Sequence, residues 1–288
     1  MKIVTELVGG ICNSKCVWCF LNYKCRDRMQ QGMMSYENFV KFIDLNRGSK
    51  MSLIPFGHGE SLLNKDFPKC YKYALAAGFR LSSVHTNLAL PLSDEEIKAM
   101  CLTESITVNF GGGTKSTQFI NMQTDLDLVL SNLSRLMSFN PRKVSAKMVI
   151  NKFNVAETDL LTEKVHSISK SIDVGFYPIY FGPADSDEED KRLFYDMNFD
   201  ENIKLRDTIV VKDDSIEVAP KRGTCYGLIT TVRWNGEVAI CCRERYSEKS
   251  VGNAFETPIS EIVASNEYKE AVELGKKRQW VKYCEVCS

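Results

Sequence analysis

Three cysteines near the start of the chain have the type and spacing needed for redox chemistry. Cys12, Cys16 and Cys19 follow an apolar run at residues 3–8 with the spacing C-x3-C-x2-C. Thiolates are the ligands that hold iron–sulfur clusters, and three of them in one short loop can bind three irons of a cubane. The fourth iron then stays open to a substrate or cofactor. This spacing predicts a reactive cluster and not a purely structural four-cysteine site.

Zinc is the alternative metal for this loop. Zinc would need a fourth ligand, and the chain has only three histidines: His58, His85 and His166. His58 and His85 both lie close to predicted strand ends, so either could approach the loop. The residue types alone therefore leave zinc open.

A second group of cysteines lies near the C-terminus. Cys225 is followed by Cys241, and Cys284 and Cys287 form a CxxC pair. Four thiolates are enough for a fully ligated iron–sulfur cluster or for a zinc ribbon, and the spacing alone is compatible with both.

Cys241 is directly followed by a further cysteine, Cys242. Neighbouring side chains on a strand point to opposite faces, so only one of the two can face a cluster. The Gly-x4-Cys spacing that starts at Gly236 selects Cys241. Cys242 is left as a packed or spare thiol.

The overall composition is that of a soluble globular protein. The chain has 288 residues, of which 44% are hydrophobic and 26% charged, and its 37 basic and 37 acidic residues cancel. We therefore expect no nucleic-acid partner. The first residues lack the apolar core of a secretory signal, and no apolar run approaches about 18 residues, so we expect a cytoplasmic protein without a membrane span. The eleven cysteines are then expected to be reduced thiols and metal ligands.

The elements that must position these residues alternate along residues 1–182. Strands are predicted at residues 3–8, 51–55, 80–85, 105–110, 143–150 and 174–181, and helices at 35–46, 67–77, 94–101, 124–139 and 156–170. Such alternation indicates a parallel sheet with right-handed crossovers. Six strands are too few for a closed eight-stranded barrel. We predict an α/β fold with a partial (β/α)6 TIM-like barrel.

The alternation of strands and helices ends before residues 183–222, which we interpret as a connector. Its acidic run at residues 183–190 is typical of a solvated loop or a helix start. Residues 223–288 are then predicted to form a small C-terminal iron–sulfur domain. This domain would contain a β-hairpin around Asn235-Gly236, followed by a helix.

The N-terminal loop, with Trp18 directly before Cys19, resembles the signature of the radical S-adenosylmethionine (SAM) enzymes. The resemblance implies that the open iron chelates the amino and carboxylate groups of SAM. It also implies that the reduced cluster cleaves SAM to a 5′-deoxyadenosyl radical. The partial barrel is the fold that this resemblance implies.

Gly57, His58, Gly59 and Glu60 come after the second predicted strand. They resemble the family's Gly-Gly-Glu-Pro segment, which lies along the methionine part of SAM. Glycines let the backbone approach a ligand, and the Glu60 carboxylate can accept a hydrogen bond from the amino group. His58 and Ser61 depart from the family pattern.

Three more residues are implied to contact SAM. Trp18 lies in the cysteine loop, Asn87 ends the third predicted strand, and Asn109 ends the fourth. Asn87 stands in a segment where related enzymes often carry Thr-Asn-Gly, here changed at Leu88. Asn109 stands where a small polar residue often meets the ribose or carboxylate.

The C-terminal region resembles a shortened SPASM domain, often called twitch. The resemblance implies one auxiliary 4Fe–4S cluster held by Cys225, Cys241, Cys284 and Cys287, and therefore two 4Fe–4S clusters in total. The full SPASM pattern has three further cysteines after the CxxC pair, and these are absent. A second auxiliary cluster is not supported.

The size and layout resemble radical SAM dehydrogenases that oxidise a secondary alcohol of an aminocyclitol or sugar. This implies a small-molecule substrate, an auxiliary cluster that accepts an electron, and a reducing partner such as flavodoxin or ferredoxin. A peptide-modifying enzyme, either an epimerase or a thioether-forming maturase, is the alternative. A non-catalytic zinc-ribbon scaffold is a third possibility from a different class.

Candidate substrate residues come from the strand ends and the junction with the C-terminal domain. Cys242 is the thiol that could return a hydrogen atom to a substrate radical. Tyr177, Tyr180, Arg222 and Arg243 are polar side chains that could contact the substrate.

Overall fold

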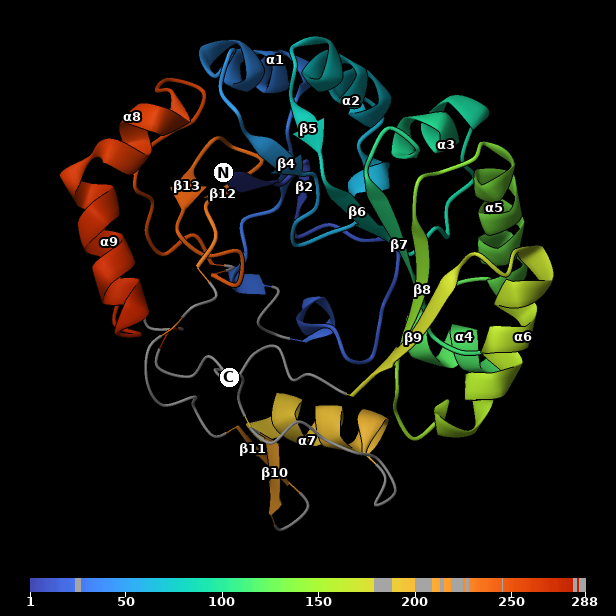
Figure 1. Cartoon of the computed structure of the whole chain (residues 1–288). Coiled ribbons are helices and arrows are strands. Elements are labelled where there is room, and N and C mark those ends of the chain that lie inside the picture. Colours follow the sequence, from blue (N-terminus) through green and yellow to red (C-terminus); the bar gives the residue numbers. More distant parts are fainter. Residues whose placement is uncertain are drawn as a thin grey trace.

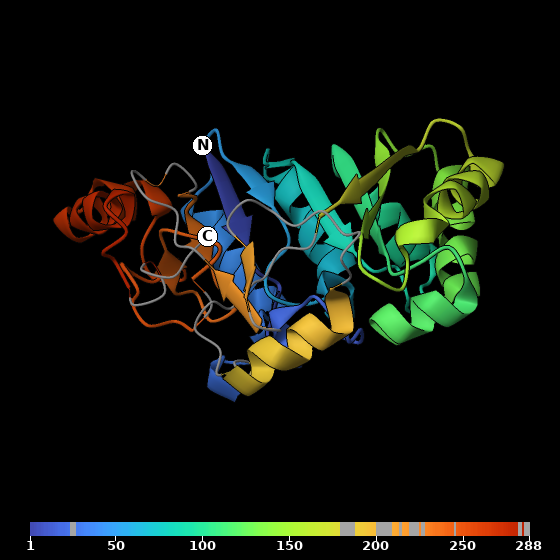
Figure 2. The same cartoon turned by 90° about the horizontal axis from the view of Figure 1, so that it is seen from below.

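The computed structural model describes residues 1–23, 27–178, 188–199, 209–212, 215–218, 225, 228–244, 246–281 and 284. In Figure 1 the strands form an arc, with helices along its outer side. Figure 2 shows the same arc from below, with α7 lying across the near side.

The helices and strands follow the predicted alternation. The strands are β1 (Lys2–Thr5), β2 (Val8–Gly9), β3 (Gly32–Met33), β4 (Ser52–Ile54), β5 (Arg80–Leu81), β6 (Ser83–Thr86), β7 (Ser105–Phe110), β8 (Val144–Val149), β9 (Asp173–Tyr177), β10 (Ile209–Lys212), β11 (Ser215–Val218), β12 (Thr231–Val232) and β13 (Val238–Ala239). The α-helices are α1 (Tyr36–Leu45), α2 (Phe67–Ala76), α3 (Asp94–Met100), α4 (Lys115–Met122), α5 (Leu126–Ser138), α6 (Thr158–Ile168), α7 (Glu188–Asn198), α8 (Ile259–Ala264) and α9 (Asn266–Lys276). Short 3-10 turns lie at Phe20–Asn22, Ser61–Leu63 and Val155–Glu157.

The core strands form two hydrogen-bonded sheets, in which all neighbours pair in parallel except β12 and β13. One has the order β13-β12-β1-β4-β5 and the other β6-β7-β8-β9. The two sheets meet at Ser82, whose N–H donates to the carbonyl of Leu53 (2.8 Å) and whose carbonyl accepts from the N–H of Ser105 (3.0 Å). The predicted α/β fold with parallel strands is confirmed. Within the described residues neither sheet closes on itself, so the structure does not establish a barrel.

Local sequence signals fix most element ends. Ser93 and Glu96 form the predicted capping box at α3, and α2 is followed by Gly78 at φ +87°. Helix α4 was not predicted, because its first residues are polar and lack a helical apolar period. It begins where the Thr114 hydroxyl accepts from the N–H of Thr117, and it ends at Gln123 in the left-handed region.

The predicted hairpin around Asn235-Gly236 is present. Strands β12 and β13 pair antiparallel, and Gly236 has φ +87°. The sequence did not reveal that β12 also pairs in parallel with β1, aligning Val4 with Thr231. The C-terminal region therefore extends the main sheet, and Figure 1 shows the hairpin beside the N-terminus.

Aromatic and aliphatic side chains fill the space between the sheets and the outer helices. Phe39 and Phe42 of α1 and Phe67 and Tyr71 of α2 are fully or almost fully buried there. None of the described helices is long and apolar enough to span a membrane.

A buried ion pair stabilises the hairpin. Arg233 and Glu244 are 4% and 2% exposed, and their charged groups are in direct contact. The Arg233 guanidinium also donates to the Glu244 carbonyl at 2.6 Å. A buried charge that loses its partner keeps its desolvation penalty, so each member depends on the other.

Replacing Arg233 by methionine should leave the Glu244 carboxylate buried without its cation. We expect a loss of about 3–5 kcal/mol in the free energy of unfolding, measured by urea denaturation. The control is Lys72→Met, which breaks the exposed Lys72–Glu95 pair and should leave the free energy of unfolding nearly unchanged. Equal losses in the two variants would contradict a structural role for the buried pair.

Candidate metal centre and cofactor site

A cavity of about 410 Å³ lies at the carboxyl ends of the parallel strands. This is the edge of an α/β sheet where ligands usually bind. Its walls come from the cysteine loop, the segment after β4, the ends of β6, β7 and β8, the end of α4 and the segment after β13. The lining residues are Cys12, Ser14, Cys16, Trp18, Cys19, Leu21, Phe56, Gly57, His58, Gly59, Glu60, His85, Thr86, Asn87, Asn109, Met122, Val149, Cys242 and Arg243.

The cysteine loop is held by helices on both sides. The N–H of Lys15 donates to Met122 O (2.9 Å), and the N–H of Val17 donates to Asn121 O (3.0 Å). From α7, the Asn198 side chain donates to Val17 O at 2.8 Å. These bonds fix the backbone that carries the three thiols.

The thiols have an electrostatic environment that suits a metal cluster. Burial raises the pKa of the Cys12 thiol to about 12, with further increases from Glu60 and Cys19. Burial, together with Cys19 and Cys12, also raises the pKa of Cys16 well above its usual range. Thiolates crowded in this way repel one another, and the positive charge of bound iron would stabilise them. The donor set therefore fits an iron–sulfur cluster.

Asn87 joins the cysteine loop to the segment after β4. Its side-chain amide donates to Asn13 Oδ1 (2.8 Å) and Ser14 Oγ (2.7 Å). Its backbone N–H donates to Glu60 Oε2 at 2.8 Å. Asn87 thus lines the cavity and also positions the residues around it.

Glu60 is buried at the wall of the cavity. Its other carboxylate oxygen accepts from the N–H of Leu62 at 3.2 Å. Burial raises the pKa of Glu60 to about 7, although the N–H groups of Asn87 and Leu62 act in the opposite direction. A positively polarised ligand group placed beside this carboxylate would favour its charged form.

Neighbouring atoms of the chain leave no space for a side chain at Gly57 or Gly59. A Cβ on Gly59 would lie 2.5 Å from the carbonyl of Ile11, and a Cβ on Gly57 would lie 2.4 Å from Cγ of Glu6. Glu60 N–H also donates to Ile11 O at 3.0 Å. The loop therefore packs directly against the segment that leads into the cysteines.

Glu6, which sequence reasoning missed, lies beneath this loop. Its carboxylate accepts from the N–H of His58 at 2.8 Å, and His58 Nδ1 lies 3.5 Å away. Burial alone would raise the pKa of Glu6, but hydrogen bonding and charge from His58, together with the charge of Arg233, hold it below its usual range. The only signal in the sequence is an acidic residue one position after β1.

The remaining predicted residues fall into three groups. Trp18, Asn109, Cys242 and Arg243 all line the cavity, and the Asn109 amide donates to Thr86 O at 3.4 Å. Tyr177 does not line it, and the ammonium of Lys147 lies 5.0 Å from its ring centre. Tyr180 and Arg222 lie outside the described residues.

The C-terminal thiols gather at a second, smaller cavity. Cys225, Cys241 and Cys284 line it together with apolar side chains such as Leu228 and Trp280. Cys287 lies outside the described residues. Among the cysteines that the structure describes, no disulfide is formed.

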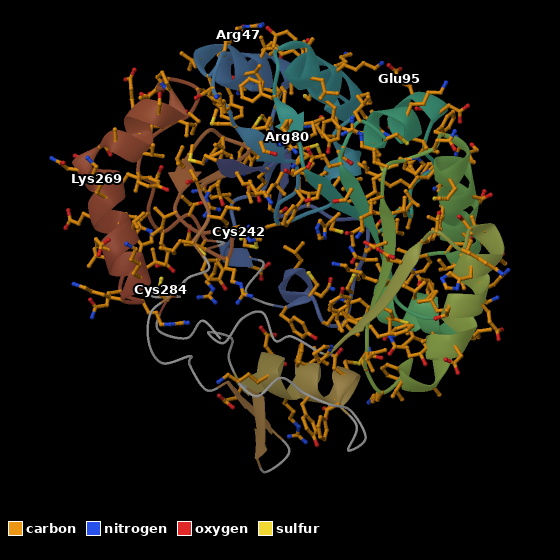
Figure 3. All side chains as sticks on the ribbon, viewed as in Figure 1. Arg47, Arg80, Glu95, Cys242, Lys269 and Cys284 are labelled. Atoms are coloured by element: carbon orange, nitrogen blue, oxygen red, sulfur yellow. The ribbon has the colours of Figure 1, made fainter. Side chains whose placement is uncertain are left out.

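The Cys241-Cys242 pair divides between the two cavities, but β13 ends at Ala239, so the two cysteines do not lie on a strand as expected. Cys241 lines the second cavity and Cys242 lines the first. In Figure 3, Cys242 lies toward the centre of the arc, and Cys284 lies by the end of α9.

The described thiols do not form a single-ion site. Across the described ranges, no three histidine, cysteine or acidic side chains lie close enough together to hold one metal ion. A zinc ion requires all its ligands within about 2.0–2.3 Å, whereas the thiolates of a cubane bind separate irons.

The C-terminal region has a recognised relative. Residues 225–288 match SPASM, described as an iron–sulfur cluster-binding domain. This confirms the resemblance that the C-terminal cysteines indicated. No curated protein matches the sequence.

The whole chain is similar in fold to several solved structures. Native anSMEcpe with bound AdoMet superposes with a TM-score of 0.67 at 15% identity, covering 99% of this chain and 87% of that one. BtrN in complex with AdoMet and 2-DOIA gives 0.56 at 14% identity, covering 100% and 92%. Streptococcus suis SuiB bound to precursor peptide SuiA gives 0.62 at 12% identity, covering 99% and 70%. The chain therefore shares the fold of these solved proteins, and its residues 225–288 match the SPASM domain.

Two separate thiol groups predict about eight irons per chain after anaerobic reconstitution, from four per cubane. Replacing Cys12, Cys16 and Cys19 together by alanine should reduce this to about four, measured by iron analysis and absorbance. Cys70→Ala is the control, because Cys70 is buried in α2 and lines neither cavity. Zinc in place of the remaining iron would refute the auxiliary cluster.

Proposed function

We propose that this chain is a radical SAM oxidoreductase that acts on a small, polyhydroxylated substrate. One observation carries the proposal. A single cavity brings together the three N-terminal thiols, the segment from Gly57 to Glu60, and Cys242 with Arg243 from the C-terminal region. When bound to the cluster, SAM supplies a deoxyadenosyl radical that removes a hydrogen atom from an unreactive C–H bond.

In this proposal each part of the chain has its own task. Residues 1–182 hold SAM and the cluster on Cys12, Cys16 and Cys19. Residues 183–222 connect to residues 223–288, which hold the auxiliary cluster on Cys225, Cys241, Cys284 and Cys287. A small redox protein such as flavodoxin or ferredoxin reduces the first cluster. The structural relatives anSMEcpe and BtrN, both solved with AdoMet, support the assignment of SAM.

The methionine part of SAM is proposed to lie along Gly57, His58, Gly59 and Glu60. Trp18, Asn87 and Asn109 border the same cavity from three other elements. Both Glu60 oxygens already accept backbone N–H groups, which hold the carboxylate in one orientation. The Thr86 side chain is a third partner of this carboxylate. An ionised carboxylate has about four lone-pair sites, so Glu60 can still accept from the ligand's amino group.

Glu60→Ala should weaken SAM binding and leave the iron content unchanged, because the acid meets the ligand and not the metal. A charge-assisted hydrogen bond contributes roughly 1.5–3 kcal/mol, so the affinity should fall about tenfold or more. Calorimetry on the reconstituted protein measures this change.

Glu157→Ala is the matched control for Glu60. Glu157 also accepts backbone N–H groups, from Gly113 (2.7 Å) and Thr114 (3.2 Å), but it does not line the cavity. An equal loss of affinity in both variants would show that loosening a loop is sufficient to weaken SAM binding, without any contact between the carboxylate and SAM. Unchanged affinity in Glu60→Ala would refute the placement of SAM.

The substrate assignment has support from size and from one relative. The cavity of about 410 Å³ lies in the range of small-molecule sites and has to accept SAM as well. BtrN was solved with 2-DOIA, a small ligand. Oxidation of a secondary alcohol then needs a second electron acceptor, a task for the auxiliary cluster beside Cys241.

A peptide-modifying reaction is the second candidate, favoured by Cys242. Its thiol lines the cavity and could return a hydrogen atom to a substrate radical, as an epimerase requires. The relatives anSMEcpe, solved with the Cp18Cys peptide, and SuiB, solved with precursor peptide SuiA, support it.

Turnover in deuterated water separates the two reactions. A dehydrogenase should form a ketone and consume SAM about once per product. Its Cys242→Ala variant should remain active. Deuterium from the oxidised carbon of a labelled substrate should appear in deoxyadenosine. Solvent deuterium at the reacting carbon that disappears in Cys242→Ala would overturn the dehydrogenase assignment.

A further inference from the structure

His85 is a cavity-lining residue with no role in cluster or SAM binding as proposed above. It lies on β6, one position before Thr86, and its ring packs against Phe56 with the ring centres 4.8 Å apart. The described structure contains no hydrogen bond to either ring nitrogen of His85. The imidazole is therefore held by packing, while its polar atoms are available to a ligand.

The surroundings of His85 are polar, although the strand layers of a TIM-type barrel are usually filled with branched apolar side chains. The β6–β7 register places His85 beside Thr107, whose hydroxyl bonds that of Ser145 on β8 at 3.2 Å. Lys147 lies further along β8 and acts electrostatically on His85. Among these four residues only His85 lines the cavity, so it is the polar group that this face presents to a ligand.

The imidazole is uncharged at neutral pH. Burial, with a smaller contribution from Lys147, lowers the pKa of His85 to about 4. A neutral imidazole keeps one nitrogen as an acceptor. The other acidic and basic groups of the cavity are engaged: Glu60 accepts two backbone N–H groups, and His58 contacts Glu6. Arg243 has no acceptor atom.

We propose that His85 is the catalytic residue that accepts the hydroxyl proton of the substrate, an inference that rests on the proposed oxidoreductase function. A hydrogen atom leaves the carbinol carbon for the deoxyadenosyl group. The hydroxyl proton passes to a ring nitrogen of His85, and one electron leaves for the C-terminal iron–sulfur cluster. The C–O single bond becomes C=O, so atoms and electrons balance. Loss of the hydrogen atom makes the neighbouring hydroxyl more acidic, which allows a weak base to act.

The test uses His85→Gln, which keeps hydrogen-bonding atoms but cannot take up a proton. The probes are 2-DOIA, myo-inositol and glucosamine, each deuterated at its carbinol carbons, with the reconstituted full chain. In the wild type, ketone and deuterated deoxyadenosine should form in a ratio of about 1:1. In His85→Gln we expect deuterium transfer to persist while the ratio falls at least tenfold.

His166→Gln is the matched control, since His166 lies on α6 beside the Ile172 carbonyl and does not line the cavity. It should keep the wild-type ratio. Iron content and the SAM affinity measured by calorimetry should be the same in all three proteins. As a further readout, free imidazole added to His85→Ala should restore ketone formation, which a purely packing role would not allow.

The outcomes distinguish failure of the role of His85 from failure of the proposed oxidoreductase function. An unchanged ratio in His85→Gln, or no rescue of His85→Ala by imidazole, would overturn the role of His85 and leave the oxidoreductase intact. If the wild type transfers deuterium from none of the three probes, the proposed function itself is overturned, and the role of His85 with it.

Discussion

The pairing of β12 with β1 is the interaction on which the site depends. The N–H of Val4 donates to Thr230 O (3.0 Å), and the N–H of Glu6 donates to Val232 O (2.8 Å). The cysteine loop follows β1, and Cys242 follows the hairpin that β12 begins. Strand pairing fixes the register of β12 against β1 to the exact residue. These few backbone bonds therefore bring segments from opposite ends of the chain to one cavity.

Buried charges reinforce that junction. Glu6 accepts from the His58 N–H and is also influenced by the charge of Arg233, and Arg233 contacts Glu244, which lines the second cavity. Charges removed from water are tolerated only when they are paired, so this series of alternating signs constrains both cavities at once. The loop proposed to hold SAM and the wall of the proposed auxiliary cluster therefore belong to one connected electrostatic unit.

Much of the fold could be predicted from local patterns. The period of apolar residues placed the core strands and most outer helices to within a few residues, and capping at Ser93 and the turn at Gly236 were visible as short motifs. Helix α4 was missed because its apolar pattern is weak and its position depends on contacts, such as Asn121 with Gly111, that are made only in the folded chain. That helix also supplies carbonyls that anchor the cysteine loop.

The sequence by itself determined the two thiol groups, since cysteine spacing within a loop is a local property. Strand alternation predicted that Cys241 and Cys242 would face different ways, but β13 ends at Ala239, so alternation does not account for their placement. Only the tertiary structure decided that Cys242, Arg243 and His85 line the same cavity as Cys12, and that Glu6 supports the loop after β4. These residues are distant in sequence, and their proximity follows from sheet order and from pairing of buried charges, which no local pattern encodes.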